Sequence, residues 1–433
     1  MQLGVWGMIL AKRMVTDYNM PVCFIQGAVG GTRIDQHQPN PAGHGVAGSL
    51  YSIYANIYNR VVGAKLTHGI RGVFWHQGEN NSGAAAPTGD YDYKSYQQYF
   101  VDMAAAWKQD FPNLQRYIMY QVMPKPCAMG PKGDQLREAQ RTLPRLFSKM
   151  NILCTLALLG YEGCHFSPTG YQNFADLTAP LVGQDFYGVV PPDVVTAPNL
   201  KRAWFTTTSR TELALEFDQN MGWNSFSKVN FYLDKVGGKV TSGSASGKIV
   251  KLQLSSAAAA TATLDYLEDN YWTPNDFSTL LYGANTLPAL TFADVAIAPP
   301  PTPYSIWAAD PAQGLTAGVN DGPLDDPDRD GIANLLELVL SGAPMASSRS
   351  ILPTLKSVGG TWTFEYDRSD LSLPPATTQV VEYGSDLTGW APVTIPATTG
   401  GAVTITPGVP TDHVKVTLPN PGPKGFARLK VSQ

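Results

Sequence analysis

The chain has 433 residues, of which 43% are hydrophobic and 15% are charged, and this composition is typical of globular domains with sizeable cores. The length predicts about three domains. A formal net charge of −4 and a pI near 5.9 leave no basic surface for nucleic acid or an anionic membrane, and no apolar run reaches the roughly 18 residues of a membrane-spanning helix.

Residues 1 to about 187 alternate between helix and strand signals. This alternation predicts a parallel sheet covered by helices, in a three-layer α/β domain at residues 1–190. Ser167 and Pro168 have the residue types of an N-cap and a first helical position. Strands are predicted at 21–25, 70–75, 116–123 and 151–159, and helices at 4–17, 51–66, 93–111, 134–147 and from Pro168 onward.

The second half of the chain is predicted to be rich in β structure. After a proline-containing linker at 191–200, apolar residues recur with a period of two, which predicts an antiparallel β-sandwich at 196–298. Four prolines at 299–303 form a stiff spacer. The same period returns near the C-terminus and predicts a second, smaller β-sandwich-like domain at 350–433, so that 304–346 is a linker with a motif of its own.

The four cysteines, Cys23, Cys127, Cys154 and Cys164, lie in the first 170 residues and form no C-x-x-C pair. Four cysteines allow three pairings, and the sequence does not choose among them. Buried free thiols are an equally good interpretation.

Polar segments follow three of the predicted strands. Trp-His-Gln-Gly-Glu at 75–79 offers an imidazole, a carboxamide and a carboxylate, and Gly-Gly-Thr at 30–32 lets backbone N–H groups approach a ligand closely. Glu162 and His165 lie three apart in a loop, so the carboxylate can orient one imidazole nitrogen while the other faces the site. Because ligands bind beyond the carboxyl ends of strands in open α/β sheets, we expect one site.

Together these segments resemble the SGNH-type esterases, and most closely the sialate O-acetylesterase and acetylxylan esterase branch. Residues 75–79 match a hallmark string of that branch, Gly-Gly-Thr-Arg-Ile at 30–34 its second block, and Glu-x-x-His-Phe at 162–166 its C-terminal block, in which the acid is usually Asp. The resemblance covers residues 1 to about 187. It implies a flavodoxin-like α/β fold and removal of O-acetyl groups from a glycan such as sialic acid or xylan.

The resemblance also implies a role for each site residue. His165 is the general base, while the Gly31 N–H and the Gln77 side chain donate to the oxyanion. Glu162 has the spacing of the usual Asp, whereas Glu79 is the orienting acid in some members, so both remain candidates, with the spacing favouring Glu162. His76 is expected to be structural.

The chain departs from this pattern at the nucleophile. Such esterases use a serine in a Gly-Gln-Ser-Asn type string upstream of a Gly-Val-Trp-Gly helix, yet here that helix begins at Gly4 and no Gly-x-Ser triplet occurs in the 433 residues. We therefore expect Met1 to be an internal methionine of a longer protein, which also accounts for the absent first strand and signal peptide. As it stands, the chain is predicted to hydrolyse esters weakly or not at all.

A second chemical motif occupies residues 326–337, which match the EF-hand loop with glycine at position 6. We predict one structural calcium ion there, which orders the joint between the two β domains, and no cofactor for catalysis. A single loop of this kind resembles the dockerin or thrombospondin type 3 motifs. The predicted ligands are Asp326, Asp328, Asp330, the Ile332 carbonyl, Asn334 and Glu337.

These observations predict a monomeric carbohydrate esterase that acts on an acetylated glycan. Calcium and β modules behind a hydrolase domain favour export, so we expect a secreted, periplasmic or cell-surface protein. The alternative is a non-catalytic, calcium-stabilised glycan-binding or surface protein on a degenerate esterase scaffold. The Arg-Glu-Ala-Gln string at 137–140 also occurs in the esterase branch, but it cannot separate the two.

Overall fold

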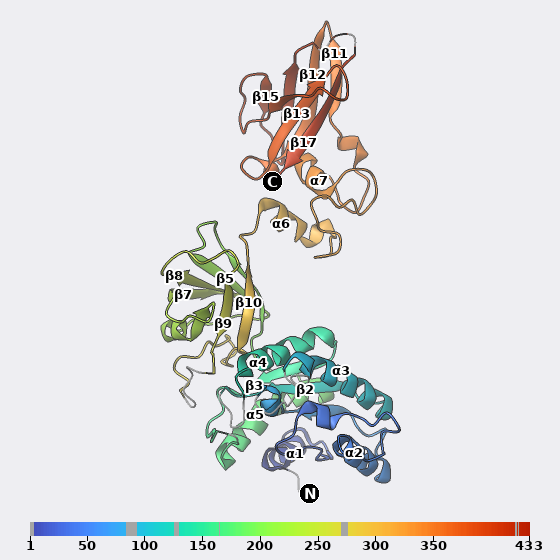
Figure 1. Cartoon of the computed structure of the whole chain (residues 1–433), viewed down its shortest axis with the longest axis vertical. Helices are drawn as coiled ribbons and strands as arrows, with labels where there is room; N and C mark the ends of the chain where they lie inside the picture. The colour runs from blue at the N-terminus through green and yellow to red at the C-terminus, as the bar shows by residue number, and fades with distance from the viewer. Residues whose placement is uncertain are drawn as a thin grey trace. The chain divides into compact units, whose positions relative to one another are not determined.

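A computed structural model describes residues 4–83, 93–124, 130–163, 165–269, 276–420, 422 and 424–433. The chain divides into two compact units, Met1–Pro300 and Pro301–Gln433 (Figure 1). Finer domain boundaries within these units remain predictions. No helix in the described ranges is long and apolar enough to cross a membrane.

The first unit begins with the α/β part that the sequence predicts. Its sheet is parallel and has the order β1 (Gly72–Trp75), β2 (Arg116–Gln121), β3 (Met150–Cys154). In Figure 1, α1 and α5, which pack together, lie on one side of the sheet, and α3 and α4 lie on the other. The helices are α1 (Val5–Tyr18), α2 (Ser52–Gly63), α3 (Tyr93–Asp110), α4 (Gly133–Thr142) and α5 (Pro168–Tyr187), with short 3₁₀ turns η1 (Ile34–His37), η2 (Glu79–Asn81) and η3 (Leu143–Leu146).

The strand predicted at 21–25 is wrong, because these residues have no regular structure. Phe24 still stacks on Phe74 of β1, with ring centroids 5.8 Å apart, and Val22 and Ile25 pack against the core. A strand forms only where a neighbour completes its backbone hydrogen bonds, and no described strand pairs with this segment. Its apolar side chains therefore cover the sheet without joining it.

The second part of the first unit is one mixed sheet with the strand order β6-β9-β10-β4-β5-β8-β7. The prediction of a purely antiparallel sandwich is wrong here, because β10 pairs in parallel with β4. The intervening chain is long enough for the crossover that a parallel pair requires. The strands are β4 (Leu200–Phe205), β5 (Glu212–Phe217), β6 (Phe231–Leu233), β7 (Val240–Ser246), β8 (Ile249–Leu254), β9 (Thr263–Tyr266) and β10 (Phe292–Ala298), with η4 (Ser225–Asn230) before β6.

Arg137 on α4 joins the two parts of the first unit. Its guanidinium is 1% exposed and forms ion pairs with Asp134 at 2.6 Å and Asp269 at 2.5 Å. The Arg137 Nε donates to Thr291 Oγ1 at 2.9 Å, and the Gln121 side chain accepts from the Thr291 N–H and donates to its carbonyl. A fully paired buried charge therefore fixes the segment before β10 against the α/β part.

Two of the cysteines are free thiols, Cys23 at the surface and Cys154 in the core. The Cys154 Sγ donates to the Ala289 carbonyl at 3.6 Å, so this thiol also belongs to the contact between the two parts. Cys127 and Cys164 lie outside the described residues.

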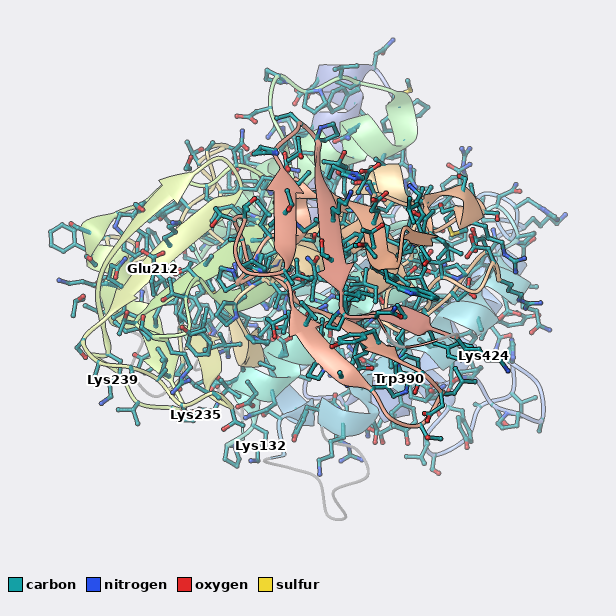
Figure 2. All side chains as sticks on the ribbon, turned by 90° about the horizontal axis from the view of Figure 1, so that it is seen from above. Lys132, Glu212, Lys235, Lys239, Trp390 and Lys424 are labelled. Carbon is teal, nitrogen blue, oxygen red and sulfur yellow. The ribbon has the colours of Figure 1, made fainter. Side chains whose placement is uncertain are left out.

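The second unit contains two antiparallel sheets, β11-β12-β16-β15 and β14-β13-β17, which share one apolar core. Trp390, labelled in Figure 2, donates its indole N–H to the Leu387 carbonyl and lies 4.3 Å from the Arg428 guanidinium. The elements are α6 (Pro303–Ala308), η5 (Pro311–Gln313), α7 (Asn334–Leu340), η6 (Arg349–Ile351), β11 (Thr354–Val358), β12 (Thr361–Ser369), η7 (Asp370–Ser372), β13 (Thr378–Gly384), β14 (Ala391–Thr394), β15 (Val403–Thr406), β16 (Thr411–Leu418) and β17 (Phe426–Ser432).

We predict that Arg137→Met lowers the free energy of unfolding by about 3 to 5 kcal/mol, because it leaves two carboxylates facing a buried apolar side chain. The matched control Arg202→Met removes an ion pair to Glu216 from a side chain that is 65% exposed, and it should cost no more than about 1 kcal/mol. Urea unfolding of the full chain measures both changes. Equal losses for the two variants would contradict the role given to Arg137.

Candidate active site

The loop after β1 is fixed from behind by α3. Trp75 is buried among aromatic rings, and its indole N–H donates to the Tyr96 hydroxyl at 3.0 Å. The Tyr96 hydroxyl in turn donates to the Gln77 carbonyl at 2.6 Å. This chain of hydrogen bonds sets where residues 76–81 lie at the carboxyl end of the sheet.

Gln140 on α4 holds the same loop from a second direction. Its Nε2 donates to the Gln77 carbonyl at 2.9 Å, while its Oε1 accepts from the Val122 N–H at the end of β2. The fit requires glycine at position 78, where φ is +154° and a Cβ would lie 2.7 Å from the Gln140 Nε2 and 3.0 Å from the Leu136 Cδ2.

The Gln77 carboxamide ties this loop to residues 30–34. Its Nε2 donates to the Thr32 carbonyl and to the Asn81 Oδ1, each at 2.9 Å. The Asn81 Oδ1 also accepts from the Ile34 N–H, and this bond fixes which way both amides point. Both Gln77 N–H groups are therefore engaged, so donation to an oxyanion would require one of these bonds to break. In this arrangement Gln77 is a positioning residue.

Gly31 presents its backbone to solvent beside this clamp. Its φ of +72° suits glycine, and no heavy atom lies within 4 Å of the position that a Cβ would take. Within the described part of the chain, no acceptor for the Gly31 N–H is found. This N–H is therefore free to donate to a ligand, as the predicted oxyanion role requires.

His76 lies under the site rather than in it. Its ring packs against Tyr120 and Phe174, with centroids 6.0 Å and 5.3 Å away, and its Nε2 is buried without a hydrogen-bond partner among the described residues. Burial lowers the pKa of His76, which the charge of Glu79 opposes and that of His165 reinforces. Phe174 also packs against Phe166, which follows His165 in the chain, with ring centroids 6.0 Å apart, so the loops after β1 and β3 converge on α5.

The Glu79 carboxylate is bound within its own loop. Its Oε2 accepts from the Gly78 N–H at 3.0 Å. Burial raises the pKa of Tyr161, and the charge of Glu79 raises it further. The Tyr161 hydroxyl donates to the Gly163 carbonyl at 2.6 Å, within the loop that contains His165.

Glu162 and His165 face each other across a tight turn. The Glu162 N–H donates to the His165 carbonyl at 2.8 Å, and Tyr161 and Phe166 form an antiparallel bridge beside it. The side chains of Glu162 and His165 are exposed. Across the described ranges, neither Glu79 nor Glu162 is hydrogen-bonded to the His165 ring, so the choice of orienting acid remains a prediction.

Three residues of this framework were given no role by the sequence: Tyr96, Asn81 and Gln140. Gln140 ends the Arg-Glu-Ala-Gln string, and Asn81 closes the polar stretch that begins at Trp75. Those signals marked the segments but not the contacts, because most of the partners lie between 19 and 63 residues away in the chain.

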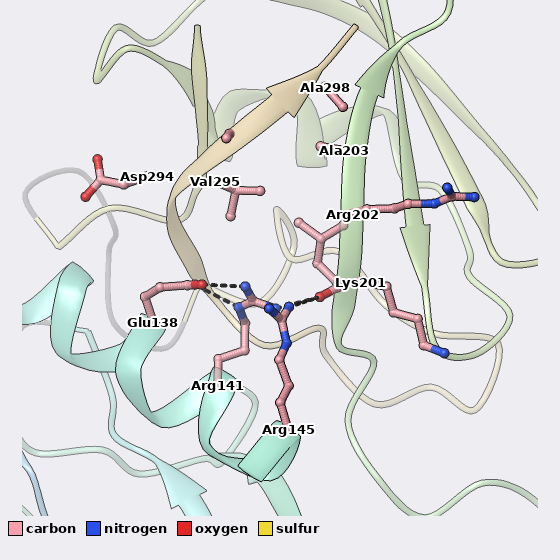
Figure 3. Close-up of a pocket in the computed structure, with 11 residues that line it drawn as sticks. Glu138, Arg141, Arg145, Lys201, Arg202, Ala203, Asp294, Val295 and Ala298 are labelled. Carbon is pink, nitrogen blue, oxygen red and sulfur yellow. Dashed lines mark hydrogen bonds and ion pairs between the residues drawn. The ribbon is translucent and has the colours of Figure 1, made fainter. Parts of the chain in front are cut away.

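A cavity of about 340 Å³ lies elsewhere in the first unit, between α4 and the strands β4 and β10 (Figure 3). Arg141, Arg145 and Lys201 line it. The Arg141 guanidinium is already bound by Glu138 and by the Leu200 carbonyl, at 2.8 Å and 2.6 Å. None of the predicted site residues lines this cavity, and Arg141 and Arg145 both donate from the α/β part to the Leu200 carbonyl of β4.

The predicted metal loop lies in the second unit. Asp326, Asp328 and Asp330 come together as predicted, with one carboxylate oxygen from each within 4.8 Å of the others. Glu337 lies in the first turn of α7 and is buried, whereas Asn334 donates its amide to the carbonyls of Asn320 and Gly322.

Comparison with known proteins identifies what the α/β part is similar to. Residues 3–176 match the family model of SASA, the sialic acid-specific acetylesterases among the carbohydrate esterases. This stretch contains the three polar segments and supports the resemblance drawn from their motifs. No curated protein matches the chain.

Among solved structures, a carbohydrate acetylesterase from Xanthomonas citri is similar, with a TM-score of 0.51 and 19% sequence identity. The match covers 66% of this chain and 64% of that one, so this chain spans less than two thirds of the matched structure. At this identity the likeness supports the fold alone.

His37 lies beneath the Gly31 loop and provides a test of its packing. Its ring meets Trp75 edge-on at 5.1 Å. The Thr32 hydroxyl donates to the Val29 carbonyl, so His37 Nε2 donates to Thr32 Oγ1 at 2.8 Å. Burial lowers the pKa of His37 to about 4, although the charge of Asp35 opposes this shift.

We predict that stability is lost as the pH falls from 6.5 toward 4, because the unfolded chain protonates His37 while the folded chain resists doing so. The folded chain should lose about 2 to 3 kcal/mol from this residue by pH 4.5. His37→Gln should remove that part of the pH dependence, and His68→Gln, at an exposed position, should not. Urea unfolding at pH 7 and 4.5 measures the difference, and identical pH dependence in all three proteins would contradict it.

Proposed function

We propose that the first unit is the scaffold of a carbohydrate O-acetylesterase, which removes acetyl groups from a glycan such as an O-acetylated sialic acid or xylan. The observation that carries the proposal is the convergence of the loops after β1 and β3, where the rings of His76 and Phe166 both pack against Phe174. The match of residues 3–176 to a carbohydrate esterase family supports the choice of an acetyl ester.

In this proposal His165 is the general base, since its imidazole is exposed beside the site. Glu79 is the proposed acid that stabilises the resulting imidazolium, because it belongs to the loop whose His76 packs on the same Phe174 ring as Phe166, the residue after His165. The Gly31 N–H donates to the oxyanion, and Gln77 holds that N–H in place through the Thr32 carbonyl.

The nucleophile sets the expected rate. The 433 residues contain no Gly-x-Ser triplet, so we propose that this chain uses water. His165 removes a proton from water, and the resulting hydroxide adds to the acetyl carbon. As the tetrahedral intermediate collapses, its bond to the sugar oxygen breaks and that oxygen takes the proton from the imidazolium. The products are a free hydroxyl and acetic acid, which releases its remaining proton to solvent as acetate. Positioning and oxyanion donors retain part of catalysis without a serine, so hydrolysis should be slow.

A second function is favoured by two observations: the missing Gly-x-Ser triplet, and a His165 ring without a hydrogen bond to Glu79 or Glu162. A degenerate site of this kind would bind an acetylated glycan without cleaving it. The two functions differ in one measurable product, which is acetate.

We predict slow release of acetate from 4-nitrophenyl acetate and from acetylated xylo-oligosaccharide by the full chain. His165→Ala should reduce it to the buffer rate. Glu79→Gln should lower kcat by about tenfold or more, while the isosteric Glu162→Gln should lower it by less than about twofold, because only the first acid stabilises the imidazolium.

A larger loss in Glu162→Gln than in Glu79→Gln would reverse the assignment of the acid. Release of acetate that is unaffected by His165→Ala would contradict the site itself. If no acetate is released but calorimetry detects binding of the acetylated and not the deacetylated oligosaccharide, the glycan-binding function replaces the esterase.

A further inference from the structure

We propose that residues 326–337 bind one Ca²⁺ ion, and that this ion fastens the start of α7 to the segment that leads into the β-sheets of the second unit. This inference concerns the second unit alone and is independent of the proposed esterase function.

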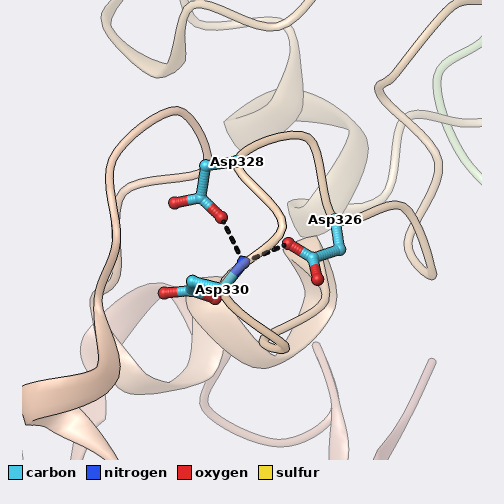
Figure 4. Close-up of side chains that lie close together, drawn as sticks. All are labelled: Asp326, Asp328 and Asp330. Atoms are coloured by element: carbon cyan, nitrogen blue, oxygen red, sulfur yellow. Dashed lines mark hydrogen bonds between the residues drawn. The ribbon is translucent and has the colours of Figure 1, made fainter.

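The loop holds its carboxylates in a converging arrangement. The Asp330 N–H donates to one oxygen of Asp326 and one of Asp328, each at 3.1 Å (Figure 4). The Gly331 N–H donates to the other oxygen of Asp326 at 2.9 Å. Arg329 and Gly331 have φ values of +61° and +91°, which turn the chain sharply enough to bring alternate side chains together. Three negative groups therefore share one small space.

Glu337 is the independent observation that points to a cation. It is 1% exposed, and neither of its carboxylate oxygens has a hydrogen-bond partner among the described residues. The Asp328 Oδ2 is also buried without a hydrogen-bond partner among the described residues. The Ser348 side chain lies beside Glu337, but its hydroxyl donates to the Ala346 carbonyl at 3.1 Å. The Ser348 N–H donates to the Asp330 Oδ2, so Glu337 and Asp330 flank the same residue. Buried carboxylates without donors are costly unless a positive charge compensates them.

The donor set selects the ion. All predicted ligands are oxygens, with no His or Cys in the cluster, which disfavours Zn²⁺ and suits a hard cation. Ca²⁺ accepts six to eight oxygens in a flexible shell, whereas Mg²⁺ demands near-ideal octahedral geometry. The two Glu337 oxygens can close the shell together, and the Ile332 carbonyl adds a further oxygen. Asn334 has only its Oδ1 left to contribute, since its amide group binds Asn320 and Gly322.

Asp330 connects the loop to the rest of the unit. Its Oδ2 accepts from the Ser348 N–H at 2.5 Å, and its carbonyl accepts from the Arg349 Nε at 2.6 Å. These residues lead through η6 into β11. An ion that fixes Asp330 therefore also fixes the chain that enters the first sheet.

The helix α7 joins two apolar clusters of the same unit. Leu335 and Leu338 pack with Trp307 of α6, whereas Val339 and Leu340 pack in the core of the two sheets. Glu337 lies between Leu335 and Leu338 in the sequence. A cation bound to Glu337 and to the aspartates would hold α7 in the position that both clusters need.

The test uses the full chain, freed of metal with EGTA and then titrated with CaCl₂ in a calorimeter. We expect one site with a Kd on the order of 10⁻⁵ to 10⁻³ M, and at least about tenfold weaker binding of MgCl₂. Glu337→Gln should weaken Ca²⁺ binding at least about tenfold. The control variant Asp367→Asn changes a carboxylate of the same unit whose side chain is 67% exposed. It should leave the Ca²⁺ affinity unchanged.

Thermal unfolding separates a calcium ligand from a purely structural glutamate, because only for a ligand should the change in Tm reverse its sign when Ca²⁺ is added. Because Gln removes an uncompensated buried charge, Glu337→Gln should have a higher Tm than the wild type in EGTA and a lower Tm in saturating Ca²⁺. If Glu337→Gln does not fold, Asp328→Asn should show the same two changes: a higher Tm than the wild type in EGTA and a lower Tm in saturating Ca²⁺. Absence of Ca²⁺ binding by the wild type, or equal binding by the wild type and Glu337→Gln, would overturn the proposal.

Discussion

The hydrogen bonds of one carboxamide hold the candidate active site together. Gln77 follows β1, but its side chain bonds to the Thr32 carbonyl and to Asn81, and Asn81 in turn bonds to the backbone of Ile34. In the described structure residues 30–34 do not follow a strand that would set their position. The hydrogen bonds of Gln77 and Asn81 set it instead. The exposed N–H of Gly31 and the packing of His37 both depend on it, and so does any chemistry at this edge of the sheet.

The two units treat buried charge in opposite ways. In the first, the guanidinium of Arg137 is matched by Asp134 and Asp269, so the buried group is neutralised within the chain. In the second, Glu337 is buried after a loop that brings three aspartates together, and no cationic side chain in the described residues pairs with it. The first arrangement is complete as a structural contact, whereas the second calls for a cation from outside the chain.

The sequence predicted what depends on local pattern. The alternation of helices and strands, the parallel sheet, and the convergence of Asp326, Asp328 and Asp330 follow from periodicity and turn residues close in the chain. The predictions from sequence were wrong where pairing with a segment far away in the chain determines the local structure. Residues 21–25 have the composition of a strand but no neighbour to pair with, and β10 takes a parallel place beside β4 that no local signal encodes. The oxyanion role of Gln77 stays a prediction, and in the structure its N–H groups are bound to Asn81 and to the Thr32 carbonyl.

The central claim is that the loops at 30–32, 75–79 and 161–166 form one site for an acetyl group. A crystal structure of the full chain with acetate, the product of the proposed reaction, tests this most directly. The account predicts acetate with one oxygen within hydrogen-bond distance of the Gly31 N–H and its methyl and other oxygen beside His165. Acetate bound instead among Arg141, Arg145 and Lys201, with the Gly31 N–H left to water, would contradict it.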